Sequence, residues 1–357
     1  MATATLSPKQ ATKSISRPLL VFGGLGVALL VMTVVSAGSG QLSIPAGEVI
    51  GSVFHRLGLD WGTSPTHPQG EAVLWQVRFP RVVMGIVVGA ALATAGAMMQ
   101  GVFGNPLAEP GVVGVSSGAA LAAATAIAFG VSVLGAWTIP VFAFVGGLVT
   151  TLLVYAMSRD GGRTEVVTLV LTGIAVNAVA SAGMAFVMFM ADTQAREQIV
   201  FWTLGSLNGT RWLYVALAAP LCLIGCVGTF VLARQLDLLA LGDRAARHVG
   251  VDVERLRLIA IVLVAILTAA AVSFCGIIGF VGLVVPHLIR ILLGPAHRQL
   301  VLASALGGAV LLVAADWFAR TAVPYADLPI GMLTALVGGP FFFWLLRKTR
   351  RTAGGWA

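Results

Sequence analysis

Residues Leu258 to Cys275 read LIAIVLVAILTAAAVSFC, an unbroken apolar run without a single charge. The run follows directly on the charged stretch VERLR at Val253 to Arg257. An α-helix needs about 20 mostly apolar residues to cross the hydrocarbon core of a bilayer. This segment therefore predicts a membrane-spanning helix that begins at a charged loop.

The same pattern recurs along the whole chain. Apolar residues make up 58% of the 357 positions and charged residues 10%, with a mean hydropathy of +0.96, whereas an average soluble domain carries roughly 25% charged residues. We predict an all-α polytopic membrane protein, with one transmembrane domain over residues 1–357 and about ten helices in a compact bundle. The expected spans are Leu19–Ala37, Val82–Phe103, Val112–Phe129, Trp137–Met157, Val166–Met190, Leu213–Ala233, Leu258–Cys275, Ile277–Leu293, Leu300–Phe318 and Ile330–Leu346.

The distribution of basic residues orients these spans. If the N-terminus is cytoplasmic, the inside loops hold 16 of the 22 lysines and arginines and the outside loops hold 6. The positive-inside rule then places both termini in the cytoplasm, with tails at residues 1–18 and 347–357 and a charged cytoplasmic loop at 234–257. A cleaved signal peptide is the alternative for the first apolar run, which ends in small residues; the length of the run favours a retained helix.

Composition also excludes several function classes. The net charge of +8 would suit nucleic acid, but no basic cluster with interleaved aromatic residues lies outside the apolar runs, so we expect membrane lipid and no nucleic acid as a partner. Cys222, Cys226 and Cys275 all lie in apolar runs, which favours neither a disulfide framework nor a metal site. None of the three lysines follows a glycine, so the chain has no P-loop for ATP.

One apolar stretch is interrupted by helix-breaking residues. Residues Gln100 to Gly111 read QGVFGNPLAEPG. Irregular backbone at membrane depth is tolerated only where protein or a water-lined cavity satisfies its polar groups. We therefore predict that Asn105, Pro106 and Glu109 line a translocation pathway, with an ordinary turn between helices as the alternative.

Further motifs follow in a fixed order. They are RFPR at Arg78–Arg81, WTLGSL at Trp202–Leu207, LGDRAARHVGV at Leu241–Val251, GFVGLVVPHLIR at Gly279–Arg290 and LPIG at Leu328–Gly331. With these motifs, from about Trp75 to Arg347, the chain resembles the FecCD permease family of bacterial ATP-binding-cassette importers for iron-siderophores, heme and cobalamin.

The resemblance implies a type II importer permease in the bacterial inner membrane. Such a permease is expected to pair with a second copy of itself around an axial pathway, and to work with two cytoplasmic ATPase subunits and a periplasmic substrate-binding protein. ATP hydrolysis would occur in the ATPase, so we expect no catalytic residues, no metal and no permanently bound cofactor in this chain.

The resemblance also implies how the ATPase is engaged. In similar transporters the loop between the sixth and seventh spans forms short coupling helices that dock on the ATPase. Here that loop maps onto Gly242 to Glu254, with Gly242, Asp243, Arg244, Arg247 and His248 as the expected contacts. A solvated charged loop is the alternative. The segment Glu165 to Thr168 lies where related transporters place a cytoplasmic gate.

On the outer face, the family implies that arginines pair with acidic residues of the binding protein. The matching positions are Arg78, Arg81 and, less closely, Arg320. Arginine suits this role because its planar fork bonds a carboxylate at two places. The alternative is a helix-end cation that snorkels to the interface.

The expected substrate is heme or a related iron chelate. The outside element Asp192 to Trp212 is predicted to be a short interfacial helix, and Arg196 lies in its part Asp192 to Trp202, beside the expected pathway mouth. An arginine there would attract the propionates of heme or an anionic ferric chelate, although pairing with Asp192 or Glu197 is equally open. The spacing of Asp192, Arg196 and Trp202 resembles heme permeases, with ferric-siderophore or cobalamin transport as the alternatives in the same family.

Two rivals come from other classes. An ion-coupled secondary transporter would need carboxylates within the membrane, and the predicted spans hold almost none apart from Glu109 and Asp316. Asp316 is more simply a partner of Arg320 at i,i+4. A sensor or assembly protein without transport is the third hypothesis, in which the charged cytoplasmic loop is a signalling dock.

Overall fold

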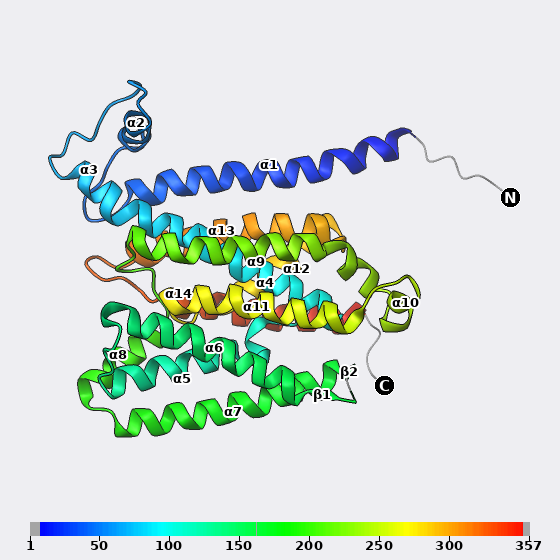
Figure 1. The fold of residues 1–357 in the computed structure, drawn as a ribbon. Coiled ribbons are helices and arrows are strands. Elements are labelled where there is room, and N and C mark those ends of the chain that lie inside the picture. The colour runs from blue at the N-terminus through cyan, green and yellow to red at the C-terminus, as the bar shows by residue number, and fades with distance from the viewer. Residues whose placement is uncertain (1–7, 162, 353–357) are drawn as a thin grey trace.

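The computed structural model describes residues 8–161 and 163–352 and is a bundle of helices (Figure 1). Each of the ten predicted spans coincides with a helix, so the fold class is confirmed. Seven helices in the described part of the chain are long and apolar enough to cross a membrane, and three apolar ones are shorter. The ten are α1 (Pro8–Gly38), α4 (Phe79–Phe103), α5 (Val115–Ala128), α6 (Thr138–Met157), α7 (Val166–Met190), α9 (Trp212–Leu239), α11 (Val253–Cys275), α12 (Val281–Leu293), α13 (His297–Thr321) and α14 (Ile330–Thr352).

Short elements connect the long helices. The stretch predicted to be a short interfacial helix contains α8, whereas the charged loop predicted at 234–257 is mostly helical, because α9 runs on to Leu239 and α11 already begins at Val253. The short elements are α2 (Ala46–Arg56), α3 (Gly70–Val73), the π-helical turn η1 (Leu74–Arg78), the 3₁₀ turns η2 (Pro110–Val113) and η3 (Gly135–Trp137), α8 (Thr193–Thr203), α10 (Asp243–His248) and the antiparallel strands β1 (Arg159–Asp160) and β2 (Arg163–Thr164).

The bundle has two distinct ends. One carries α2, α3 and α8 and is called the α2 end; the other carries α10, β1 and β2 and is called the α10 end (Figure 1). The start of α1 and the end of α14 both lie at the α10 end (Figure 1). An even number of crossings accounts for this, since each crossing carries the chain to the opposite end.

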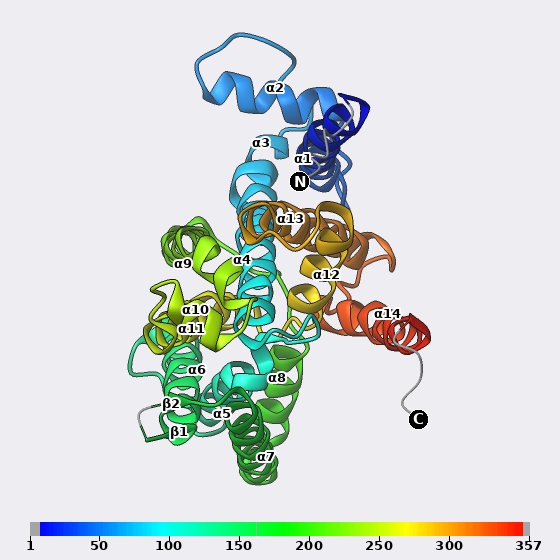
Figure 2. The ribbon, with the colours of Figure 1, turned by 90° about the vertical axis from the view of Figure 1, so that its right-hand side faces the viewer.

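Helix α4 is the centre of the bundle and packs against α13, α9, α11 and α12 (Figure 2). Close approach of backbones makes this possible. A Cβ atom added at Gly89 would lie 2.2 Å from the carbonyl oxygen of Gly308 on α13, and one added at Gly96 would lie 1.8 Å from that of Gly282 on α12. Small residues thus allow the tight helix packing that lipid-embedded bundles use in place of a hydrophobic driving force.

Candidate functional site

The interrupted stretch after α4 is irregular in the structure, as the sequence predicted. Gly104 ends α4 with a left-handed φ of 59°, and Glu109 is extended before the turn η2. Asn105 and Pro106 are exposed, and the Asn105 side-chain oxygen accepts a 2.9 Å hydrogen bond from the Leu107 amide. The chain therefore returns into the bundle as a loop before α5 begins.

Glu109 joins this loop to a second irregular segment. Its Oε1 accepts a hydrogen bond of 3.1 Å from the amide of Phe280, the residue just before α12, which has a left-handed φ of 66°. Helix α12 runs from this contact to Leu293, and its 13 residues span about 20 Å. The contact therefore lies about that far from the connection between α12 and α13, well inside the bundle. On the other side, Asn177 of α7 donates 3.2 Å to the Gly111 carbonyl. Protein groups thus satisfy the broken backbone, as membrane depth requires.

The five residues predicted to engage an ATPase gather on α10 and its N-terminal flank. Gly242 precedes the helix with φ 98°. Arg244 and His248 are exposed and make no hydrogen bond or ion pair with any described residue. Asp243 and Arg247 bond back to α11. Buried Ala246 anchors the helix in the core.

Two large apolar side chains flank α10 and face outward. Leu241 is 69% exposed and Val249 60% exposed. The α10 surface therefore combines exposed cations with exposed apolar groups. Such a mixture is characteristic of a surface that another protein covers.

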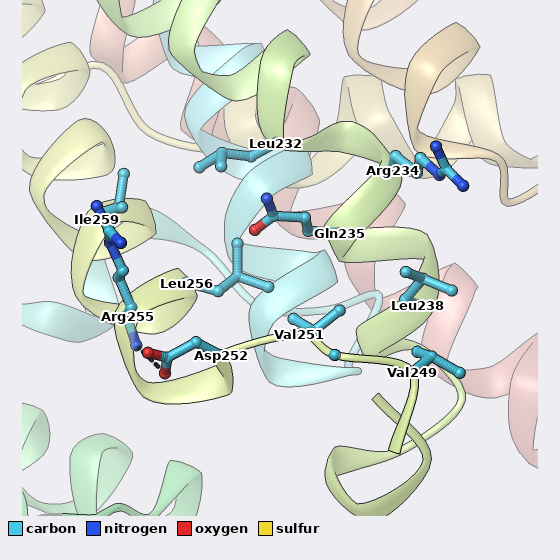
Figure 3. Close-up of a pocket in the computed structure, with 11 residues that line it drawn as sticks. Leu232, Arg234, Gln235, Leu238, Val249, Val251, Asp252, Arg255, Leu256 and Ile259 are labelled. Carbon is cyan, nitrogen blue, oxygen red and sulfur yellow. Dashed lines mark hydrogen bonds between the residues drawn. The ribbon is translucent and has the colours of Figure 1, made fainter. Parts of the chain in front are cut away.

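A groove of about 530 Å³ lies beside α10, between the end of α9 and the start of α11 (Figure 3). Gln235 and Leu256 face its interior, and Arg234 and Arg255 lie at opposite rims (Figure 3). The Asp252 carboxylate caps α11 by accepting 3.0 Å from the Arg255 amide. The groove gives the α10 end a recess with charged edges.

At the α2 end, two of the arginines predicted to dock a binding protein, Arg78 and Arg81, are buried, and only 9% of the Arg320 side chain is exposed. Arg81 pairs through Nε with Asp316 at 2.9 Å and through Nη1 with Asp327 at 2.7 Å. Arg320 pairs with the other oxygen of Asp316 at 3.2 Å. The interpretation as snorkelling cations is therefore wrong, while the predicted i,i+4 pair of Asp316 and Arg320 is confirmed.

The same cluster ties down the loop after α1. Arg78 donates 2.7 Å to the Ala37 carbonyl and also bonds the Leu42 carbonyl. Arg320 donates 2.6 Å to the Ser36 carbonyl. All three arginines border a pocket of about 810 Å³, and Asp327 is the most exposed carboxylate of the cluster, with 35% of its side chain accessible.

Arg196 is exposed on α8 but pairs with neither Asp192 nor Glu197. Its Nε donates 2.9 Å to the Met188 carbonyl and its Nη2 donates 3.3 Å to that of Phe189. Both carbonyls belong to the last turn of α7, so Arg196 caps that helix. Asp192 instead caps α8, by accepting 2.7 Å from the Ala195 amide. Arg196 and Asp192 therefore each bond a helix end and do not form a charge pair with each other.

The comparisons with known proteins agree with this architecture. The model of the FecCD transport family matches residues 28–348. The chain belongs to the FecCD transport family. It is a permease of the ATP-binding-cassette importer class with the type II importer fold, as the sequence motifs predicted.

Three relatives are similar to the permease along nearly its whole length. The hemin transport system permease protein HmuU of Yersinia pestis is 41% identical over 95% of this chain and 98% of its own. The cobalamin import system permease protein BtuC of Halobacterium salinarum is 38% identical over 92% of each chain. A solved structure, an inward-facing conformation of a metal-chelate type ABC transporter, superposes with a TM-score of 0.81 at 33% identity over 93% of this chain and 99% of that one.

Sequence reasoning missed two groups in the permease that its structure makes prominent. Arg257 was counted as a loop charge, yet it is buried on α11 and bonds two other elements. Its position beside Val253, Leu256 and Ala260, all buried, was the available signal, because an arginine on the buried face of a helix requires internal partners. Asp327 carried no comparable signal, since it lies in the short connection between α13 and α14 and not on the face of a helix.

Proposed function

We propose that this permease moves heme, or a related iron chelate, from a periplasmic binding protein to the cytoplasm of a bacterium. Similarity to a hemin permease over nearly the full length of both chains supports this substrate. The cobalamin permease relative supports cobalamin as a second candidate. In this proposal both termini and the α10 end are cytoplasmic, and the α2 end faces the periplasm.

The ATPase docks on α10, and the exposed surface of that helix is the observation that carries the proposal. Arg244 and His248 are exposed there without partners in the described chain, beside the exposed Leu241 and Val249. The adjoining groove supplies a recess for side chains of the partner. Exposed apolar side chains are unfavourable in water. Burial of Leu241 and Val249 against a second protein removes their apolar area from solvent and favours docking.

A second copy of the permease completes the pathway. A pocket of about 370 Å³ between α5 and α7 is lined by hydroxyl and amide groups, among them Ser117, Asn177, Ser181 and Thr203. Polar groups on a lipid-facing surface are unfavourable, so they indicate a water-lined or protein-covered face. With a partner opposite α7, this face becomes the wall of an axial cavity, which Arg196 borders at the α2 end.

The interrupted loop gives the pathway its cytoplasmic side. Asn105 and Pro106 lie exposed toward the α10 end, and Glu109 lies deeper in the bundle. Asp316 does not serve a proton relay in this scheme, because Arg81 and Arg320 both neutralise it. The driving force therefore comes from ATP hydrolysis in the partner rather than from an ion gradient.

The binding protein docks at the α2 end over the pocket that Arg78, Arg81 and Arg320 border. In the undocked permease, the Asp327 carboxylate forms an ion pair with the Arg81 guanidinium. A carboxylate of the binding protein competes for that position, since a guanidinium donates hydrogen bonds to any well-placed carboxylate. The arginines thus hold the docking surface in shape and also receive the partner.

The test is uptake into proteoliposomes that contain the permease and its ATPase, with the binding protein and ATP supplied. Heme, a ferric siderophore and cobalamin are compared as substrates. We expect heme uptake that requires all three proteins and ATP. Uptake driven by a proton gradient without any ATPase contradicts the proposed function, and preferential uptake of cobalamin replaces the substrate while keeping the mechanism.

A further inference from the structure

Two residues one turn apart on α11, Glu254 and Arg257, each contact the same two elements. One element is the end of strand β2, just ahead of α7. The other is α10. No other described pair of charged side chains bridges these three elements, and Arg257 is only 6% exposed.

The contacts to β2 hold a single residue by both of its backbone groups. Glu254 Oε2 accepts a hydrogen bond of 2.9 Å from the amide of Thr164. Arg257 Nη1 donates 2.9 Å to the carbonyl of the same residue. Thr164 is 3% exposed and lies two positions before the first residue of α7, Val166. Because both its N–H and its C=O are fixed, the start of α7 cannot turn relative to α11 without breaking a buried, charge-assisted bond.

The contacts to α10 hold that helix at both ends. Arg257 Nη2 donates 2.9 Å to Asp243 in its first turn. Glu254 Oε1 accepts 3.3 Å from Arg247 in its last turn. Between them, Ala246 packs against the core with no exposed surface. The short helix is therefore attached at two points to the same two residues of α11 that hold the start of α7.

We propose that Glu254 and Arg257 form a clamp that makes α10 and the start of α7 move as one unit. The inference rests on the proposed docking of the ATPase at α10. When the ATPase displaces α10, the clamp passes that displacement directly to α7, the helix that carries Asn177 and Ser181 on the pathway face. Glu254 and Arg257 are positioning residues, since neither contacts substrate nor nucleotide.

The movement is testable with pairs of spin labels on the assembled permease–ATPase complex. Ala245→Cys, a half-buried position on α10 outside the expected ATPase contacts, is paired with the exposed Val167→Cys at the start of α7. A reference pair joins Ala245→Cys to Gln299→Cys, an exposed position on α13 outside the clamp. The native cysteines are replaced, and distances are measured with and without ATP.

We expect the reference distance to change on ATP binding while the distance from α10 to α7 stays the same. In Arg257→Met the distance from α10 to α7 also changes or broadens. The clamp is overturned if the wild-type distance from α10 to α7 changes as much as the reference distance, or if neither changes although the ATPase is bound. Failure of the ATPase to bind at all refutes the proposed function instead.

The ratio of substrate uptake to ATP hydrolysis, called the coupling ratio, separates this role from simple support of the fold. Glu254→Gln, the milder change, and Arg257→Met are expected to lower substrate uptake per ATP hydrolysed on the order of tenfold. Arg257→Lys keeps the positive charge but lacks the planar guanidinium with its several donors. It is therefore expected to retain more of the wild-type ratio than Arg257→Met. Arg298→Met, an exposed arginine at the same end, is the matched control and keeps the wild-type ratio. Equal losses of uptake and hydrolysis in the clamp variants contradict the coupling role.

Discussion

Replacement of Asp316 by asparagine tests the buried charge cluster at the α2 end. Only 2% of the Asp316 side chain is exposed, and its two oxygens face Arg81 at 2.9 Å and Arg320 at 3.2 Å. Asparagine preserves the shape but removes the negative charge. Two guanidinium groups, each with at most 10% of the side chain exposed, are then left facing each other in a poorly solvated site.

The size of the effect follows from this burial. Removing one partner of a buried ion pair costs about 3–5 kcal/mol, because the remaining charge stays buried without compensation. Asp327 still holds Arg81 in the variant, which favours the low end, so we predict a loss of ~3 kcal/mol in the free energy of unfolding. Asp327→Asn is the matched control: its single ion pair is partly exposed and contributes about 0.2–1 kcal/mol.

The measurement is unfolding of the purified permease in mixed micelles, followed by loss of helical circular dichroism as the fraction of denaturing detergent rises. Both variants are compared with the wild type under the same lipid and salt conditions. A loss below ~1 kcal/mol for Asp316→Asn, or a loss equal to that of Asp327→Asn, refutes the reasoning. Such a result means that water or a neighbouring group already neutralises the two arginines.

Three further substitutions test the helix packing, the α2 end and the interrupted loop. Gly89→Ala should destabilise the permease by about 1–3 kcal/mol through overpacking, whereas Gly23→Ala, where nothing lies within 4 Å of the new Cβ, should not; the same unfolding assay decides. Asp327→Asn should tighten binding of the binding protein by about 1.4- to fivefold in a titration, since an internal competitor worth about 0.2–1 kcal/mol is removed, and weaker binding contradicts the competition. Glu109→Ala should cost about 1–3 kcal/mol by leaving the Phe280 amide unsatisfied, while Glu109→Gln retains an acceptor and most of the stability; equal losses in both variants argue against the bond.

The transmembrane helices are predictable because apolar runs report directly where lipid replaces water. Their ends are less so, as α9 shows. Hydropathy places its end near Ala233, but the helix continues through Arg234 and Asp237 to Leu239. Backbone hydrogen bonds do not stop where lipid stops, so the charged residues that close the apolar run remain helical.

The candidate sites differ in how far apart in the sequence their residues lie, and this decides which of them could be predicted. The position of α10 follows from a local motif, and local patterns carry over well into structure. The clamp does not, because Arg257 bonds Thr164 across 93 positions and no local pattern marks that pairing. The arginines predicted to dock the binding protein show the same limit: Arg81 bonds Asp327 across 246 positions, so a residue expected at the surface is buried by a distant partner.

Cross-linking at α10 tests whether the energy for transport enters the permease there. Arg244→Cys is placed in a permease that lacks the native cysteines, expressed with the ATPase, and treated with a bifunctional thiol reagent. We expect a cross-link to the ATPase and no labelling by an impermeant thiol reagent added outside intact cells. Labelling from outside, with no cross-link to the ATPase, contradicts it.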